Sequence, residues 1–196
     1  MTDTVSGSQR SSTSAYPIGT APPAYPAPAL PPHLRALPDG QARPIVLWPD
    51  PVLTARCEPA AVLDWREIGQ LSADLLATMY QAQGRGLAAP QLGVPVRMFV
   101  MDAGWKQGSP EPMVVIDPWL RHAGPSGDAH SETMDEACLS IPGQSFAVTR
   151  PTRVQLSWFT LDGVSVSVDL DGIAARIAQH EYDHLQGRLI NGATGV

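Results

Sequence analysis

Two histidines four residues apart, His180 and His184 in the stretch AQHEYDHLQG (178–187), are the residue types best suited to chemistry. In an α-helix, positions i and i+4 project from one face about 6 Å apart along the axis, so both imidazoles can reach one ion. Glu181 would then lie beside the open position of that ion. Such pairs also occur by chance, and an inward-facing histidine is often an ordinary core residue. The helix therefore predicts a metal site but leaves the alternative open.

The two histidines are an incomplete site, because a catalytic ion of the zinc type usually has three protein ligands and one open position. The residues after His184, LQGRLINGATGV (185–196), contain no histidine or acidic residue, so we expect the third ligand upstream. Cys138 in DEACLSIPG (135–143) is a candidate, because a thiolate binds Zn²⁺ and Fe²⁺ strongly. A lone cysteine is also often a small buried hydrophobe, and the sequence alone leaves that interpretation open.

The bulk composition limits the class of protein. A chain of 196 residues fits one domain with a sizeable core. Its formal net charge of -6 and pI near 5.2 argue against a general polyanion binder, so we expect no specific nucleic-acid partner. No apolar run approaches the roughly 18 residues of a membrane span, so we expect no membrane partner. Two cysteines and a start without a secretory pattern favour a reducing, cytoplasmic location.

Residues 1–42 form a separate compositional zone, rich in serine and threonine and then in proline, as in APPAYPAPALPPHL (21–34). Closely spaced prolines favour extended backbone without a packed core. We therefore predict a disordered Pro/Ala/Ser-rich arm over 1–42 and a catalytic domain over 43–196. A solvated leader is the favoured interpretation of the arm. A partner-binding arm and a transit peptide are the alternatives, and the transit peptide is opposed by Asp3 and the prolines.

Hydrophobic periodicity predicts the elements that position these residues. Residues 64–83 read as a helix capped by Asp64, residues 97–103 and 112–120 as strands, and residues 154–170 as a hairpin around an Asp162-Gly163 turn. A second helix runs over 171–187, and its inward face is expected to carry Ile173, Ile177, His180, Glu181 and His184. Strands and helices come in blocks rather than in βαβ alternation, which predicts an α+β fold.

Three stretches, GRGLAAPQ (84–91), EACLS (136–140) and HEYDH (180–184), resemble in this order the signature motifs of the peptide deformylases, G-x-G-x-A-A-x-Q, E-G-C-L-S and H-E-x-D-H. The resemblance covers about residues 44 to 191. It implies small antiparallel sheets packed around a central helix that carries HEYDH. It also implies a metal-dependent hydrolase that removes the N-formyl group from the N-terminal formylmethionine of nascent polypeptides and releases formate.

The resemblance further assigns roles to six residues. It implies that one divalent metal ion is bound by Cys138, His180 and His184. Glu181 matches the general acid and base of the family, and the Gln91 side-chain amide and the Leu139 backbone N–H match the donors to the oxyanion. Fe²⁺ is the expected ion, with Zn²⁺, Ni²⁺ or Co²⁺ as alternatives. The implied partners are N-formylmethionyl peptides and the ribosome near the exit tunnel.

Other positions qualify this resemblance. Glu136 and Arg150 match family positions that we expect to pair and to orient EACLS, with an exposed, uncoupled pair as the alternative. Ala137 replaces the glycine of the family motif, and Ser145 stands where many members have arginine. We expect Cys57 to be inert.

Two further functions stay open on the sequence. A deformylase-like protein that binds metal or formyl peptides without efficient turnover is suggested by Ala137 and by the short segment after Ile190. A general HExxH peptidase is the other alternative, but it gives Cys138 no role.

Overall fold

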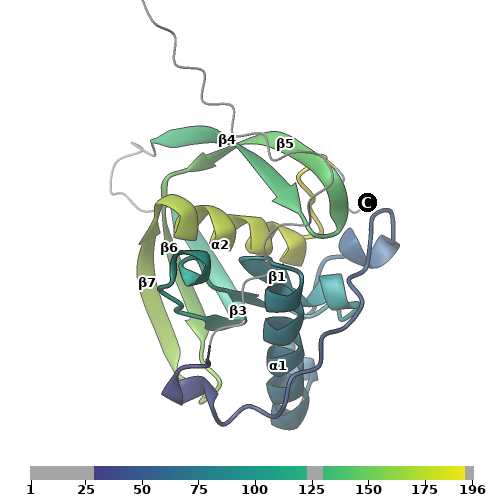
Figure 1. The fold of residues 1–196 in the computed structure, drawn as a ribbon, viewed down its shortest axis with the longest axis vertical. Helices are drawn as coiled ribbons and strands as arrows, with labels where there is room; N and C mark the ends of the chain where they lie inside the picture. Colours follow the sequence, from purple (N-terminus) through teal and green to yellow (C-terminus); the bar gives the residue numbers. More distant parts are fainter. Residues whose placement is uncertain (1–28, 123–129, 193–196) are drawn as a thin grey trace, which may run out of the picture.

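The computed structural model describes residues 29–122 and 130–192, and within them the chain forms two packed sheets and two α-helices (Figure 1). The helices are α1 (Trp65–Gln81) and α2 (Gly172–Leu185). The antiparallel sheet with strand order β1-β2-β3-β6-β7 consists of β1 (Gly86–Ala88), β2 (Met98–Met101), β3 (Met113–His122), β6 (Arg153–Phe159) and β7 (Ser165–Asp171). A separate two-stranded sheet consists of β4 (Ser131–Cys138) and β5 (Ile141–Pro151).

Helix α1 begins at the predicted N-cap Asp64, which the structure shows to be part of a capping box with Glu67. The Asp64 carboxylate accepts hydrogen bonds from the backbone N–H groups of Arg66 and Glu67, and the Glu67 carboxylate accepts one from Asp64 N–H. The predicted apolar face of α1 is buried against β1, β2 and apolar residues between Leu30 and Ile45. This face consists of Ile68, Leu71, Leu75, Leu76 and Met79. Capping and burial of this face together fix α1 beside the strand that leads into the site.

The predicted hairpin is formed by β6 and β7, which pair antiparallel from Arg153 with Asp171 to Phe159 with Ser165. The turn contains Asp162 and Gly163, and Gly163 has the positive φ of 73° that such a turn requires. Period-2 alternation buries one face of β6, which consists of Val154, Leu156 and Trp158. The hairpin therefore supplies part of the surface on which α2 lies.

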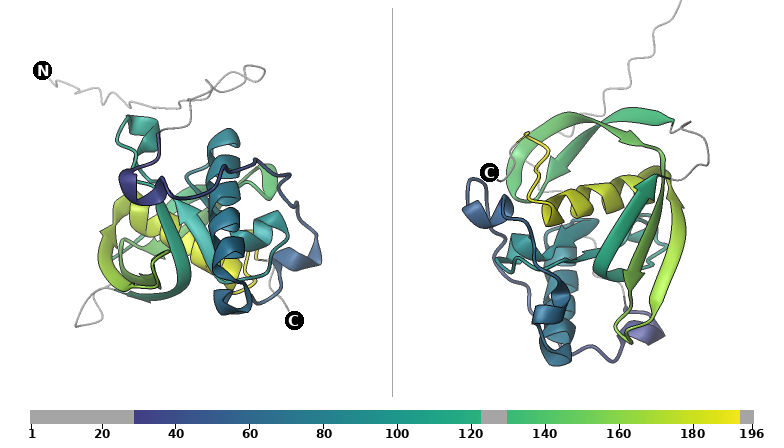
Figure 2. Two further views of the ribbon diagram at one scale, coloured as in Figure 1. Left: turned by 90° about the horizontal axis from the view of Figure 1, so that it is seen from below. Right: turned by 180° about the vertical axis from the view of Figure 1, so that it is seen from behind.

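Helix α2 lies between the two sheets and contacts strands of both, β1, β2, β6 and β7 on one side and β5 on the other (Figures 1 and 2). Ala175, Ala178 and Leu185 of α2 are completely buried, and the two alanines are small enough to let the helix approach the strands closely. The expectation for Ile173 is wrong, because this side chain is 44% exposed at the first turn and lines a pocket. Asp171 is the N-cap residue, but its side chain makes no capping hydrogen bond.

The predicted disordered arm falls in two parts. Residues 1–28 lie outside the described residues. Residues 29–42 pack on the domain, where Leu34 is 3% exposed and the Gln41 N–H donates to the Asp74 carboxylate at 2.9 Å. Leu30, Leu34 and Leu37 supply apolar contacts within the proline-rich run, so the packed chain begins before residue 43.

Candidate metal centre and active site

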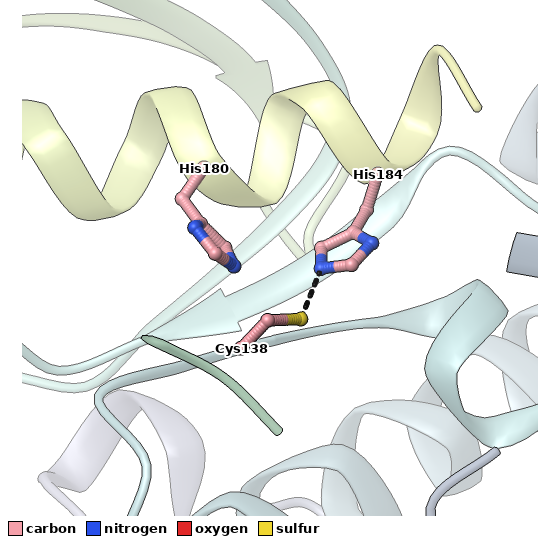
Figure 3. Close-up of side chains that lie close together, drawn as sticks. All are labelled: Cys138, His180 and His184. Atoms are coloured by element: carbon pink, nitrogen blue, oxygen red, sulfur yellow. Dashed lines mark hydrogen bonds between the residues drawn. The ribbon is translucent and has the colours of Figure 1, made fainter. Parts of the chain in front are cut away.

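The structure brings together Cys138, at the end of β4, and the two histidines of α2. Their potential ligand atoms all lie within 4.8 Å of one another, and Cys138 Sγ is 3.4 Å from His184 Nε2. Figure 3 shows both rings projecting from consecutive turns of α2 toward the sulfur. Sequence positions 42 to 46 residues apart thus converge on one point because β4 and α2 pack together. The two rings themselves are 5.2 Å apart between centroids.

The orientation of His180 is set by Glu136, two residues before the cysteine. His180 Nδ1 lies 3.0 Å from Glu136 Oε2, which leaves Nε2 directed at Cys138. In the cluster without an ion, burial lowers the pKa of His180, but its hydrogen bonds to Cys138 and Glu136 outweigh burial and raise it to about 10; a bound metal would replace the proton on Nε2. A carboxylate on the second ring nitrogen is the usual partner of a metal-binding histidine, because it fixes the tautomer.

The predicted pairing of Glu136 with Arg150 is observed and is buried. Arg150 donates to both carboxylate oxygens of Glu136, at 2.7 and 3.0 Å, and also to Asp183 at 2.7 Å. Burial raises the pKa of Glu136, but the hydrogen bonds from His180 and the arginines lower it to about 2. Glu136 is therefore a carboxylate, and the alternative of an exposed, uncoupled pair is wrong.

The sequence analysis missed Arg176, which is a second arginine on the same carboxylate. Its Nη1 donates to Glu136 Oε1 at 2.7 Å, and its guanidinium also donates to Glu132 O and Val148 O at 2.7 and 3.0 Å. Arg176 thereby ties α2 to both strands of the small sheet. Its position four residues before His180 on a helix was a signal, since i and i+4 share a face.

Glu181 lies beside the cluster and is 4% exposed. Burial raises the pKa of Glu181 to about 7, against the opposing charges of His180 and Arg150. Its Oε2 has no hydrogen-bond partner. A carboxylate whose pKa lies near neutrality and whose buried oxygen is unsatisfied is suited to exchange a proton with a reacting group.

Gly86 in β1 makes room for the Glu181 carboxylate. A Cβ atom added at Gly86 would lie 2.2 Å from Glu181 Oε1 and 2.7 Å from its Cδ. Gly86→Ala is therefore expected to displace the carboxylate and lower kcat by about 10²-fold, which is what a displacement of about 1 Å can cost.

Steady-state kinetics of Gly86→Ala, together with its metal content, measure this effect. Gly69→Ala is the matched control, because Gly69 lies within α1 and an added Cβ would only touch Pro38 at 3.9 Å. Full activity of Gly86→Ala would show that Glu181 does not need its observed position.

Gln91 and Leu139, which the sequence analysis expects to act on an oxyanion, lie next to the cysteine. The Gln91 side-chain oxygen Oε1 accepts from Ala88 N–H at 2.8 Å, which directs the side-chain nitrogen Nε2 toward Ser140 Oγ at 3.1 Å and Cys138 Sγ at 3.8 Å. Leu139 follows the cysteine in the turn between β4 and β5 and lines the pocket. All six expected site residues are therefore gathered around one cavity or in direct contact with residues that line it.

The cavity is a pocket of about 470 Å³ over the cluster. Residues 83–86 form one rim of the pocket, and the rest of its lining comes from Gln91, residues 134–139 and 141–144, and α2 between Ile173 and Glu181. Ala137 is exposed and lines this pocket, whereas Ser145, its neighbour across the β4–β5 ladder, does not line it. The methyl group of Ala137 is therefore part of the pocket lining.

Known proteins are similar to this chain in sequence and in fold. The profile of the polypeptide deformylase family matches residues 42–193. The peptide deformylase of Brucella suis biovar 1 is 40% identical over 148 residues, covering 75% of this chain and 81% of that protein. The peptide deformylase of Bartonella henselae is 38% identical over 150 residues, with the same shares.

Solved structures of peptide deformylases have a similar fold. The crystal structure of peptide deformylase from Thermotoga maritima superposes with a TM-score of 0.69 at 34% identity, covering 80% of this chain and 99% of that one. The peptide deformylase from Synechococcus elongatus in complex with actinonin gives a TM-score of 0.67 at 34% identity, covering 80% and 82%.

A Cys/His/His cluster beside a buried glutamate on an HExxH helix is the arrangement of a metal-dependent hydrolase. The chain belongs to the peptide deformylase family. The predicted α+β fold and the predicted deformylase activity are confirmed by these relatives. Among the described residues no helix has the length and apolar character needed to cross a membrane.

Proposed function

We propose that this chain hydrolyses the N-formyl group of N-terminal formylmethionine on nascent polypeptides and releases formate. The observation that carries the proposal is the cluster of Cys138, His180 and His184, which lies with the buried Glu181 at one pocket. We place the reaction in the cytoplasm, near the ribosomal exit tunnel where formylated chains emerge.

The cluster fits a single divalent ion. One sulfur and two imidazole nitrogens converge, and His180 is held by Glu136 in the orientation that a ligand needs. The soft thiolate supports Fe²⁺ as the ion, with Zn²⁺, Ni²⁺ or Co²⁺ as substitutes. When bound, such an ion activates water as a nucleophile and polarises a carbonyl group.

The protein residues supply the proton transfers and stabilise the developing charge. Glu181, with a pKa of about 7, accepts the proton of the attacking water and delivers it to the departing amine. The Gln91 amide nitrogen and the Leu139 backbone N–H donate to the formyl oxygen as it becomes negative. Losing one such donor typically costs about 3 kcal/mol of barrier. Because Ala88 N–H binds the Gln91 side-chain oxygen Oε1, the orientation of the amide is set before the substrate binds.

The pocket also supports an extended peptide as the substrate. Strand β1 is at the edge of its sheet, pairs with β2 on one side and borders the pocket. Such an edge can pair with an incoming peptide backbone. Apolar side chains from three elements, Met134, Leu139, Ile173 and Ile177, line the same pocket and suit a methionine side chain.

A substrate panel tests the function. Formate release is expected from a formylmethionyl peptide, with no release of acetate from the acetylmethionyl analogue and no cleavage of internal peptide bonds. Cleavage of internal bonds would instead indicate a general peptidase. Metal bound at one ion per chain without any formate would indicate the binding protein that Ala137 suggests.

Alkylation of the two cysteines provides an independent prediction about metal removal. With metal bound, Cys138 is expected to resist iodoacetamide, and after chelation its labelling is expected to increase. Cys57 is expected to stay unlabelled in both states, because it is buried and burial raises its pKa to about 11. Mass spectrometry of the peptides measures both sites, and labelling of Cys138 that is unchanged by chelation would contradict its role as a ligand.

A further inference from the structure

One rim of the pocket, residues 83–86, is bound by a single segment, residues 102–106 between β2 and β3. Three successive carbonyl oxygens of the rim accept hydrogen bonds from that segment: Arg85 O from Asp102 N–H at 2.8 Å, Gly84 O from Trp105 Nε1–H at 2.8 Å, and Gln83 O from the Lys106 ammonium. We refer to residues 102–106 as the brace. Its side-chain donors are Trp105 and Lys106.

The brace is itself held in the core. The Asp102 carboxylate, completely buried, accepts hydrogen bonds from Tyr80 Oη–H at 2.8 Å and from the N–H groups of Trp105 and Glu111 at 3.1 Å each. Burial, together with Asp102, raises the pKa of Tyr80, so its hydroxyl stays a donor. The Trp105 ring packs edge-on against Tyr80 with centroids 5.2 Å apart. The brace is therefore bonded both to Tyr80 of α1 and to the rim, and it fixes the position of the rim relative to α1.

The rim needs such support because it begins in an unfavourable backbone conformation. Gln83 has a φ of 56°, the left-handed region, and follows the end of α1 in a Schellman motif with Gly84 N–H bonded to Met79 O at 2.8 Å. A residue other than glycine is strained there. The Lys106 ammonium bonds the carbonyl oxygen of this residue, and a cation at a helix C-terminus is favourable.

We propose that Trp105 and Lys106 are positioning residues for the peptide substrate, holding the rim in the shape that accepts the residues after formylmethionine. The inference rests on the proposed deformylase function. The Glu181 carboxylate is the nearest group to a Cβ atom added at Gly86, whereas a Cβ atom added at Gly84 would be nearest to Leu139 Cδ1, at 2.9 Å. Distortion of 83–85 should therefore weaken binding of longer peptides more than it slows bond cleavage.

Substitution of Lys106, compared on substrates of two lengths, tests the inference. Lys106→Met is expected to raise KM for a formylmethionyl tripeptide about tenfold, as when loss of the bond to Gln83 O leaves the binding-competent shape of the rim populated about one-tenth of the time. A smaller change is expected in kcat and in KM for formylmethionine amide. Lys106→Arg should keep the wild-type KM for the tripeptide, because arginine is also a cationic donor. Arg66→Met, which removes an exposed cation at the other end of α1, is the control and should leave both substrates unaffected.

Two further measurements test the same inference without the Lys106→Met variant. Trp105→Phe retains the aromatic ring but loses the donor to Gly84 O, and it should shift the tripeptide KM in the same direction. Lys106 is the only lysine in the chain, so an amine-acetylating reagent modifies Lys106 and the α-amine alone. Burial lowers the pKa of Lys106, which favours the neutral amine that such a reagent attacks. Acetylation should raise the tripeptide KM of the wild type but not that of Lys106→Arg.

The inference is overturned if Lys106→Met and Trp105→Phe change KM equally for both substrates, or leave both unchanged while only thermal stability falls. That outcome would leave wild-type formate release intact and so would not affect the proposed function. A wild-type protein that releases no formate from either substrate would instead refute the deformylase function.

Discussion

Glu181→Gln is expected to reduce kcat for formate release by about 10³-fold, within the range typical of losing a general acid and base. The amide cannot take up a proton from water at neutral pH, whereas the carboxylate of Glu181, with a pKa of about 7, can. Glutamine has nearly the same shape, so the pocket and the Gly86 contact should be kept. Steady-state kinetics and metal analysis of the same preparation measure both properties.

Metal content is expected to stay at one ion per chain in Glu181→Gln, because Glu181 is outside the Cys/His/His cluster. Glu58→Gln is the matched control, since Glu58 is exposed and outside the pocket. Equal loss of metal and activity in Glu181→Gln would mean that this carboxylate is a ligand rather than a proton carrier. Retained activity would remove it from the mechanism.

Cys138→Ala is expected to lose metal affinity by more than the 10–100-fold that removal of a supporting partner of a ligand typically costs. The substitution leaves only His180 and His184, which is too few for a stable catalytic ion. Activity should fall in proportion to the metal lost, and high metal concentration should restore it only in part. Titration with a competing chelator measures the change in affinity.

Cys57→Ala is the control for Cys138→Ala, because Cys57 is also buried but lies in a different apolar cluster, with Phe99 and Leu156. It should keep the metal and the activity. A Cys138→Ala protein that binds metal as tightly as the wild type would show that the thiolate is not a ligand.

The sequence predicted the parts of the fold that depend on local chemistry. The Asp64 cap, the buried alternation of β6 and the i, i+4 pair His180 and His184 each depend on residues close together in the sequence, and all are observed. The pairing of Glu136 with Arg150 came from the family resemblance rather than from local pattern.

Other features that depend on packing between distant segments were missed. Arg176 reaches Glu136 across 40 residues of sequence, and the brace meets the rim only because β1 pairs with β2. Ile173 fits the apolar stripe of α2 but lies at an end of the helix that faces the pocket rather than the core. Residues 29–42 were predicted to be disordered from their proline-rich composition, but Leu30, Leu34 and Leu37 within them pack on the core.

X-ray absorption at the metal edge of anaerobically purified protein that is releasing formate identifies the atoms that hold the catalytic ion. We predict one sulfur and two imidazole nitrogens among the ligands of a single ion per chain, from Cys138, His180 and His184. A fully active sample whose metal has no sulfur ligand would contradict this assignment.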